Sequence, residues 1–203
     1  MKPTLLLPNP LGDAVNAIHR LEPCWNRFVV RTPRGPLMRR ILAWLGIHTS
    51  DGRADISLSL NEGPCTLSSV DDIISGLGGN HAWTRPELGH GAVLCPNAST
   101  PEKEWPWWHL LDGMGRFVGS WHPDPLGAIV SAQTVVANHS GLAHLGALLG
   151  RRVICLQNAW HPVDPIGSTV IGSAAAGWPS PQEVSSAIAD GSYCLSQTAL
   201  STR

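Results

Sequence analysis

The sequence predicts an α/β protein made of two small Rossmann-like domains that face a central cleft. Short apolar runs alternate with amphipathic stretches along the chain, which favours parallel sheets with helices on both faces. The 203 residues include 21 glycines and 17 prolines, a composition that predicts many short elements joined by tight turns. The alternation restarts near Gly91 after a polar stretch. We therefore expect an N-terminal domain over residues 1–90 and a C-terminal domain over residues 91–203.

In the N-terminal domain, apolar and periodic segments predict three strands and three helices. The expected strands cover residues 4–7, 27–31 and 55–60. The expected helices cover residues 13–21, 36–45 and 67–77. The first helix follows a turn at Pro10-Leu11-Gly12, and the second is stopped by Gly46.

The C-terminal domain shows the same alternation. The expected strands cover residues 92–95, 116–118, 134–137 and 152–156. The expected helices cover residues 106–114, 125–132, 141–149 and 181–189. Because ligands bind beyond the carboxyl ends of parallel strands, the loops after these strands are where a site is expected.

Composition excludes several classes of protein. Hydrophobic residues make up 43% of the chain, which argues against intrinsic disorder. The net charge of −1 provides no overall basic field for nucleic acid. No apolar run approaches the roughly 20 residues that cross a bilayer, and the start lacks a signal-peptide pattern. Five cysteines without a Cys-x-x-Cys pair indicate reduced thiols, a cytoplasmic protein and no structural zinc.

The most informative segment runs from Thr134 to Leu145, where an apolar strand is followed at once by a helix. Ser140 and Gly141 stand at the expected helix start, where free backbone N–H groups favour an anion such as phosphate. His144 lies four residues after Ser140, so both side chains can face the same side of the first turn. The alternative is that Ser140 only caps the helix and His144 only packs.

A second segment, Cys95 to Pro106, follows the first strand of the C-terminal domain. Ser99, Thr100 and Lys103 supply two hydroxyls and an ammonium, which are donors suited to phosphate. The alternative is a solvated surface turn around Lys103. A third segment, Gly12-Asp13, follows the first strand of the chain, and its carboxylate can accept a proton from a hydroxyl. Asp13 can equally be a helix cap.

Together these segments resemble the family 9 glycosyltransferases, the bacterial heptosyltransferase family of lipopolysaccharide synthesis. Members carry a Gly-Asp pair after the first strand, matched by Gly12-Asp13. Their Lys-x-Trp-Pro element is matched by Lys103-Glu104-Trp105-Pro106. Their Asp-Ser/Thr-Gly-x-x-His-Leu element is partly matched by residues 139–145. The likeness is clearest over residues 92–160 and thinner over the first 45.

The resemblance implies a GT-B arrangement and transfer of a sugar from a nucleotide diphosphate sugar, with inversion, no essential metal and no cofactor. It makes Asp13 the general base, and Lys103 the group that offsets charge on the leaving diphosphate. Lys103 also belongs to the implied donor-binding set, which is Gly12, Asn97, Ser99, Thr100, Lys103, His139, Ser140, Gly141 and His144. Trp105 is expected to pack in the core, and Trp121 and Trp160 to line the cleft or fill the core.

Two features depart from the family. His139 occupies the position of an acidic residue that contacts the donor sugar, so the resemblance leaves the donor sugar open. The N-terminal domain is short, and an open cleft can accept a glycan, a protein, a small molecule or a modified nucleobase. A second subunit in a homo-oligomer can cover apolar surface. The rival functions are a non-catalytic nucleotide-sugar-binding protein and a nucleotide-sugar hydrolase.

Overall fold

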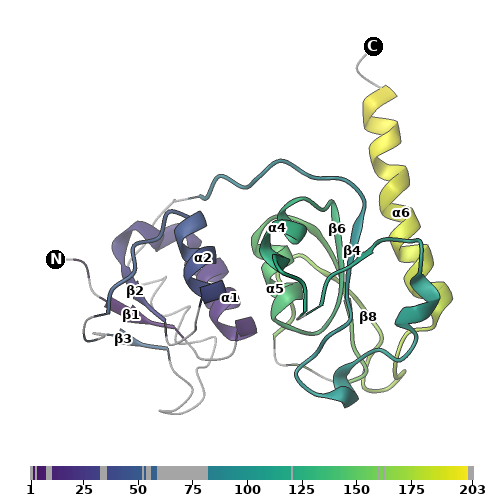
Figure 1. Cartoon of the computed structure of the whole chain (residues 1–203), viewed down its shortest axis with the longest axis horizontal. Helices are drawn as coiled ribbons and strands as arrows, with labels where there is room; N and C mark the ends of the chain where they lie inside the picture. The colour runs from purple at the N-terminus through teal and green to yellow at the C-terminus, as the bar shows by residue number, and fades with distance from the viewer. Residues whose placement is uncertain are drawn as a thin grey trace. The chain divides into compact units, whose positions relative to one another are not determined.

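A computed structural model describes most of the chain. The described residues are 2, 4–7, 11–32, 36–51, 53, 56–58, 82–119, 121–159, 161 and 163–200, with the backbone alone for residues 57 and 191–200. The chain divides into two compact units, Met1–Arg85 and Pro86–Arg203. Figure 1 shows the elements of both units, coloured from purple at the N-terminus to yellow at the C-terminus.

The first unit contains a three-stranded parallel sheet in the order β2-β1-β3. Its elements, in chain order, are β1 (Thr4–Leu6), α1 (Leu11–Arg20), the 3-10 helix η1 (Glu22–Arg27), β2 (Val29–Arg31), α2 (Pro36–Trp44) and β3 (Ile56–Ser57). The buried side chains of Leu5 and Val30 come from the two neighbouring strands β1 and β2. This parallel pairing confirms the α/β class for the described part of the unit.

The starts of two elements in the first unit differ from the sequence prediction by two residues each. Helix α1 begins at Leu11, so Gly12 lies in its first turn and not in a turn before it. The predicted strand over residues 27–31 begins two residues late, at Val29, because η1 continues through Arg27. Pro23, near the start of η1, suits a helical turn, where a missing N–H costs little. The predicted helix over residues 67–77 lies outside the described residues.

The second unit contains a five-stranded parallel sheet in the order β5-β4-β6-β7-β8. Its strands are β4 (Ala92–Cys95), β5 (Arg116–Phe117), β6 (Thr134–Asn138), β7 (Arg152–Leu156) and β8 (Thr169–Ile171). Its helices are η2 (Pro101–Lys103), η3 (Trp108–Leu111), α4 (Pro125–Val130), α5 (Gly141–Leu148) and α6 (Pro181–Leu200). Strands β4 and β7 match their predicted ranges.

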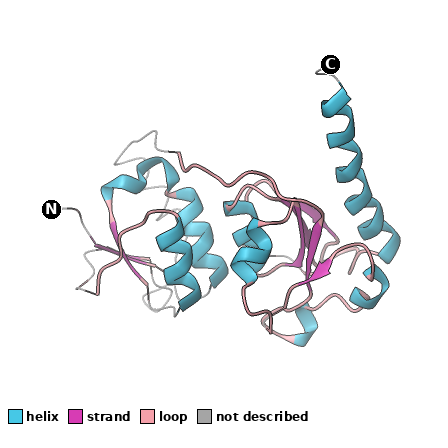
Figure 2. Cartoon of the chain, turned by 45° about the horizontal axis from the view of Figure 1, so that its top comes forward, coloured by secondary structure: helices cyan, strands magenta, loops and turns pink. Residues whose placement is uncertain are grey.

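Helices cover both faces of this sheet, as the alternation predicted. Helices α4 and α5 lie on one face and α6 on the other (Figures 1 and 2). Gly146 brings α5 close to the sheet, since a Cβ there would lie 3.0 Å from Val135 Cγ2 and 3.1 Å from Val153 Cγ2. On the other face, Trp105 and Trp108 pack in one buried cluster with residues of α6. The packing prediction for Trp105 is therefore confirmed.

The largest differences from the prediction in the second unit concern three elements. The helix expected over residues 106–114 is a short 3-10 helix, η3. Strand β8, Thr169–Ile171, was not predicted. Helix α6 continues to Leu200, beyond the expected end at residue 189. No helix in the described part of the chain is long and apolar enough to span a bilayer.

Candidate functional site

The loops that carry the predicted donor-binding residues follow three adjacent strands of the second unit. Cys95 pairs in register with Ala137, and Asn138 with Leu156, so β4, β6 and β7 end side by side. We call the described residues of the loops that follow them, 96–105, 139–140, 157–159, 161 and 163–164, the carboxyl edge. The fold thus brings two of the predicted segments to one end of one sheet, the place where such sheets bind ligands.

Asn138 holds the loop after β4 against the end of β6. Its buried Oδ1 accepts a hydrogen bond from the Trp105 backbone N–H (2.9 Å), and its Nδ2 donates to the Pro96 carbonyl. The Trp105 indole N–H donates to the Pro179 carbonyl (2.8 Å). The loop is therefore fixed at both its start and its end. Sequence reasoning did not assign this role to Asn138, although a polar residue ending an apolar strand was a signal.

The hydroxyls and the lysine of the loop after β4 face solvent. Ser99, Thr100 and Lys103 are all exposed. The Thr100 side chain hydrogen-bonds Glu102, and this bond is the main reason that the pKa of Glu102 lies below its usual range. A hydroxyl has one proton to donate, so Glu102 competes with any phosphate for Thr100. Lys103 and Ser99 are thus better placed than Thr100 to donate to an anion.

The start of α5 carries a buried hydroxyl whose hydrogen-bonding capacity is unused. Ser140 precedes the helix, but its side chain makes no capping hydrogen bond. Its Oγ is buried and has no hydrogen-bond partner among the described residues. An unsatisfied buried hydroxyl costs about 1–3 kcal/mol, which a bound acceptor removes. The interpretation that the Ser140 side chain caps the helix is therefore not supported. A role in which its hydroxyl donates to a bound anion fits better.

The backbone at the start of α5 adds donors to the same place. The N–H groups of Ala143 and His144 both reach the Ser140 carbonyl, at 3.1 Å and 3.3 Å. Gly141 lies ahead of these bonds in the first turn, where an N–H has no acceptor within the helix. The positive end of the helix dipole also favours an anion there. Gly141 thus occupies the position that its predicted role requires.

Three histidines of the carboxyl edge and of α5 lie together. The rings of His139 and His161 are stacked, with centroids 3.8 Å apart and an interplanar angle of 2°. The ring of His144, which is buried, meets His139 edge-on at 5.4 Å. His139 Nε2 lies 2.9 Å from the Val163 carbonyl oxygen and 3.4 Å from Asp164 Oδ1. His161 could not be predicted from the sequence, since a single histidine in a proline-containing loop shows no pattern.

The surroundings of the stacked pair favour neutral rings. Burial lowers the pKa of His139, the charge of Lys103 lowers it further, and the Val163 carbonyl and Asp164 oppose this shift. Burial also lowers the pKa of His161, as do the charges of His139 and Lys103, with Asp164 opposing. Lys103 therefore acts electrostatically on both rings. The loops after β4, β6 and β7 form one electrostatic cluster.

Asn97 and Trp121 extend the carboxyl edge toward β5. A Cβ on Gly119 would lie 2.4 Å from Trp121 Nε1 and 2.5 Å from Asn97 Oδ1, so both side chains lie over that glycine. Trp121 is 65% exposed and does not fill the core. Its ring is thus available at the rim of the site. Trp160 lies outside the described residues.

Asp13 and Gly12 belong to the first unit. Both lie in the first turn of α1, and Asp13 is exposed. A carboxylate there is favoured by the helix dipole. This placement agrees with a capping role as well as with a base, so the role of Asp13 stays a prediction.

The cysteines that the structure describes are buried. Cys24, Cys95 and Cys155 are buried free thiols. Burial raises the pKa of Cys95 to about 12 and that of Cys155 to about 12, which keeps these thiols protonated and unreactive. Within the described ranges, no group of three or more His, Cys, Asp or Glu side chains is arranged to hold a metal ion.

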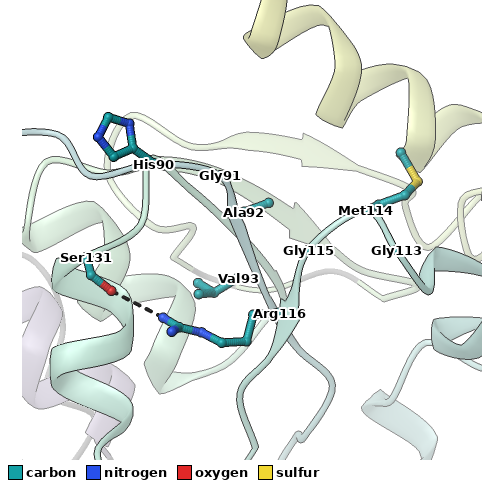
Figure 3. Close-up of a pocket in the computed structure, with 9 residues that line it drawn as sticks. All are labelled: His90, Gly91, Ala92, Val93, Gly113, Met114, Gly115, Arg116 and Ser131. Atoms are coloured by element: carbon teal, nitrogen blue, oxygen red, sulfur yellow. Dashed lines mark hydrogen bonds between the residues drawn. The ribbon is translucent and has the colours of Figure 1, made fainter.

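A pocket of about 400 Å³ lies at the opposite end of the same sheet (Figure 3). Its lining comes from the starts of β4 and β5 and from the end of α4, and includes His90, Arg116 and Ser131. The Arg116 guanidinium donates to Ser131 Oγ (3.2 Å) and to the Ala128 carbonyl (3.5 Å). None of the predicted site residues lines this pocket.

No protein-family model and no curated protein matches the sequence. Solved structures do match the fold. E. coli heptosyltransferase WaaC with ADP is similar with a TM-score of 0.53 and 14% identity, over 93% of this chain and 99% of that chain. E. coli ADP-heptose LPS heptosyltransferase II has a TM-score of 0.47 and 13% identity, over 87% of this chain and 93% of that one. A family 9 glycosyl transferase from Veillonella parvula has a TM-score of 0.47 and 12% identity, over 85% and 86%.

These observations define the class of fold. The parallel sheets with flanking helices are those of a Rossmann-like α/β protein. The likeness to WaaC narrows this to a heptosyltransferase-like fold, as the sequence motifs predicted. At 14% identity this likeness concerns the fold, and the function has to be argued from the residues of the site.

Proposed function

We propose that this protein is a glycosyltransferase that moves a sugar from a nucleotide diphosphate sugar to an acceptor hydroxyl. The observation that carries the proposal is the carboxyl edge of the second unit. There Lys103, a buried Ser140 hydroxyl without a partner among the described residues, and the start of α5 supply hydrogen-bond donors for an anion. They do so on a fold similar to that of a heptosyltransferase whose structure contains ADP.

The diphosphate of the donor is the group that this edge suits best. Lys103 supplies a point charge, and Ser140 and Gly141 supply a hydroxyl and a backbone N–H. His144 lies in the first turn of α5, four residues after Ser140. Ser99 and Asn97 contribute neutral hydrogen-bond donors from the loop after β4. Because diphosphate becomes more negative as it leaves the sugar, donors fixed before the reaction lower the barrier to its departure.

The proposed reaction is a direct displacement. The acceptor oxygen attacks the anomeric carbon, and the bond from that carbon to the donor phosphate oxygen breaks. Asp13 takes the proton of the acceptor hydroxyl, while Lys103 offsets charge on the leaving nucleotide diphosphate. A single displacement inverts the anomeric centre and needs no metal.

The choice of sugar and acceptor is tied to two features. His139 stands where the related family has an acidic residue, so we do not assign heptose as the donor sugar. The proposed acceptor is a glycan, a protein, a small molecule or a modified nucleobase. We place the enzyme in the cytoplasm, where nucleotide sugars are made, and a homo-oligomer fits its short first unit.

A thermal-shift panel of ADP-, UDP- and GDP-sugars, followed by product assays with and without acceptors, tests the proposal. We expect at least one nucleotide sugar to raise the melting temperature, and nucleotide release to require an acceptor. Binding without turnover would make the protein a nucleotide-sugar-binding protein. Release that needs no acceptor would make it a hydrolase. No stabilisation by any member of the panel would contradict the proposal altogether.

A further inference from the structure

We propose that the stacked His139–His161 pair binds the donor diphosphate together with Lys103, and that the pair takes up a proton from solvent when the diphosphate binds. This inference rests on the proposed function, because it concerns the same site. It adds His161, a residue outside the sequence motifs, and it makes donor binding dependent on pH. The proton uptake is a property of this chain's own pair of histidines.

The geometry of the pair leaves a definite place for the proton. His139 Nε2 lies 2.9 Å from the Val163 carbonyl oxygen, an atom that only accepts, so the neutral ring carries its proton on Nε2. Nδ1 of His139 is then the basic nitrogen of that ring. His161 lies flat against the same ring at 3.8 Å, so a proton on either ring is felt directly by the other.

The charges that face the pair come from every element around it. Lys103 of η2 is positive and disfavours a proton on either ring, whereas Asp164 of the loop after β7 favours one. His144 of α5 meets His139 edge-on. Cys155 of β7, which Asp164 also influences, stays a neutral thiol. Without a ligand, burial first, and then the charge of Lys103 and repulsion between protonated rings, favour a neutral pair.

A bound diphosphate reverses this balance. Its charges offset Lys103 and attract a proton to the pair, so the rings change from neutral acceptors to charged donors. Linkage requires the reverse as well, since a ligand that draws a proton in binds more tightly at lower pH. Ser140, whose buried Oγ has no partner among the described residues, follows His139 directly in the chain and offers a further donor to the same ligand.

Titration calorimetry with ADP measures this proton uptake directly. Binding enthalpies are compared in buffers of different ionisation enthalpy at about pH 6, 7 and 8, for wild type, His161→Phe and His109→Phe. Phe keeps a flat ring against His139 but cannot take a proton. His109 is an exposed histidine of η3 and serves as the matched control. ADP ionises identically in all three titrations, so differences between proteins report on the protein.

We expect wild type and His109→Phe to take up more protons per ADP than His161→Phe, by up to about one. As the pH rises, the ADP affinity of wild type should then fall more steeply than that of His161→Phe, by up to about a further tenfold per pH unit. His161→Gln, which has no titrating ring, provides the same readout if His161→Phe does not fold. ADP binding with equal proton uptake in wild type and the His161 variants overturns the inference and leaves the proposed function standing. Wild type that binds neither ADP nor inorganic pyrophosphate at any of these pH values overturns both.

Discussion

The two ends of the five-stranded sheet differ in shape and in chemistry. The amino end holds a pocket of about 400 Å³, but the Arg116 guanidinium that lines it already donates to Ser131 and Ala128. The carboxyl end holds the exposed Lys103, the buried Ser140 Oγ without a partner among the described residues, and two stacked histidines. A hollow lies at one end of the sheet and unused hydrogen-bonding capacity at the other.

This difference shows which property identifies a binding site for a charged ligand. A hollow measures space, and an arginine satisfied by the protein's own acceptors gives that space little attraction for an anion. An unsatisfied buried hydroxyl at a helix start, on the same sheet edge as a lysine, carries a free-energy cost that a ligand removes. We therefore propose that the nucleotide-sugar donor binds at the carboxyl end.

The largest expected effect is on turnover, and it comes from Asp13, which lies in the first unit and at neither end of this sheet. Asp13→Asn keeps the size of the side chain but removes the proton acceptor, so turnover should fall by about 10²–10⁴-fold. Donor binding, which we assign to the second unit, should change little. Initial rates of sugar transfer and calorimetric ADP affinity measure the two effects. Wild-type turnover in Asp13→Asn would show that Asp13 is not the base.

A second prediction concerns the residue that builds the carboxyl end. Asn138→Leu removes the acceptor of the Trp105 N–H and the donor to the Pro96 carbonyl, and it leaves a buried N–H unpaired. We expect unfolding by urea to show a loss of about 2–4 kcal/mol. Arg116→Ala, which removes hydrogen bonds of an exposed side chain at the amino end, should cost less than about 1 kcal/mol. Equal losses would mean that Asn138 does not anchor the loop.

The comparison of the two ends is sharpest for donor affinity. Lys103→Ala should weaken ADP binding by about 1.5–3 kcal/mol, or roughly 10- to 150-fold, because it removes a charge-assisted hydrogen bond. Arg116→Ala should leave ADP binding unchanged, since that side chain lines the pocket at the other end. Calorimetry on the two variants decides between the ends. A loss in Arg116→Ala without one in Lys103→Ala would move the donor to the pocket.

The smallest expected effect is on stability as a function of pH. The folded protein holds the pKa of His139 and of His161 below the ordinary value of 6.5, so the unfolded chain binds more protons in acid. The stability contributed by the neutral pair is complete above pH 6.5 and is lost as the pH falls below it. His161→Phe should therefore flatten the urea midpoint between about pH 5 and 7 relative to wild type. His109→Phe should follow the wild-type curve, and identical curves for all three proteins would contradict the pKa shifts.

Strong local patterns made part of this protein predictable. Strands β4 and β7 are apolar runs bounded by punctuation, and the start of α5 follows a strand directly, so their positions could be predicted from the sequence. Helix α1 begins earlier than predicted because Gly12, which favours turns locally, is accommodated in its first turn. The stacking of His161 on His139 joins residues from two loops, and no local pattern encodes it.

The candidate site shows the same division. Ser140, Gly141 and Lys103 were predicted as phosphate-binding residues, and the register of β4 and β6 places their loops at one edge. The anchoring amide of Asn138 and the hydrogen bond of Thr100 to Glu102 depend on tertiary contacts. The types of residue and their place at the carboxyl edge could thus be predicted from the sequence. Which hydrogen-bond donors are already used by other residues of the protein could be seen only in the structure.

Hydrogen–deuterium exchange with and without ADP tests the central claim most directly. Binding at the carboxyl end predicts slower exchange in peptides covering residues 97–105, 139–146 and 157–164, with residues 88–93 and 113–117 unchanged. Slower exchange confined to residues 88–93 and 113–117 would place the ligand in the pocket at the amino end and contradict the account.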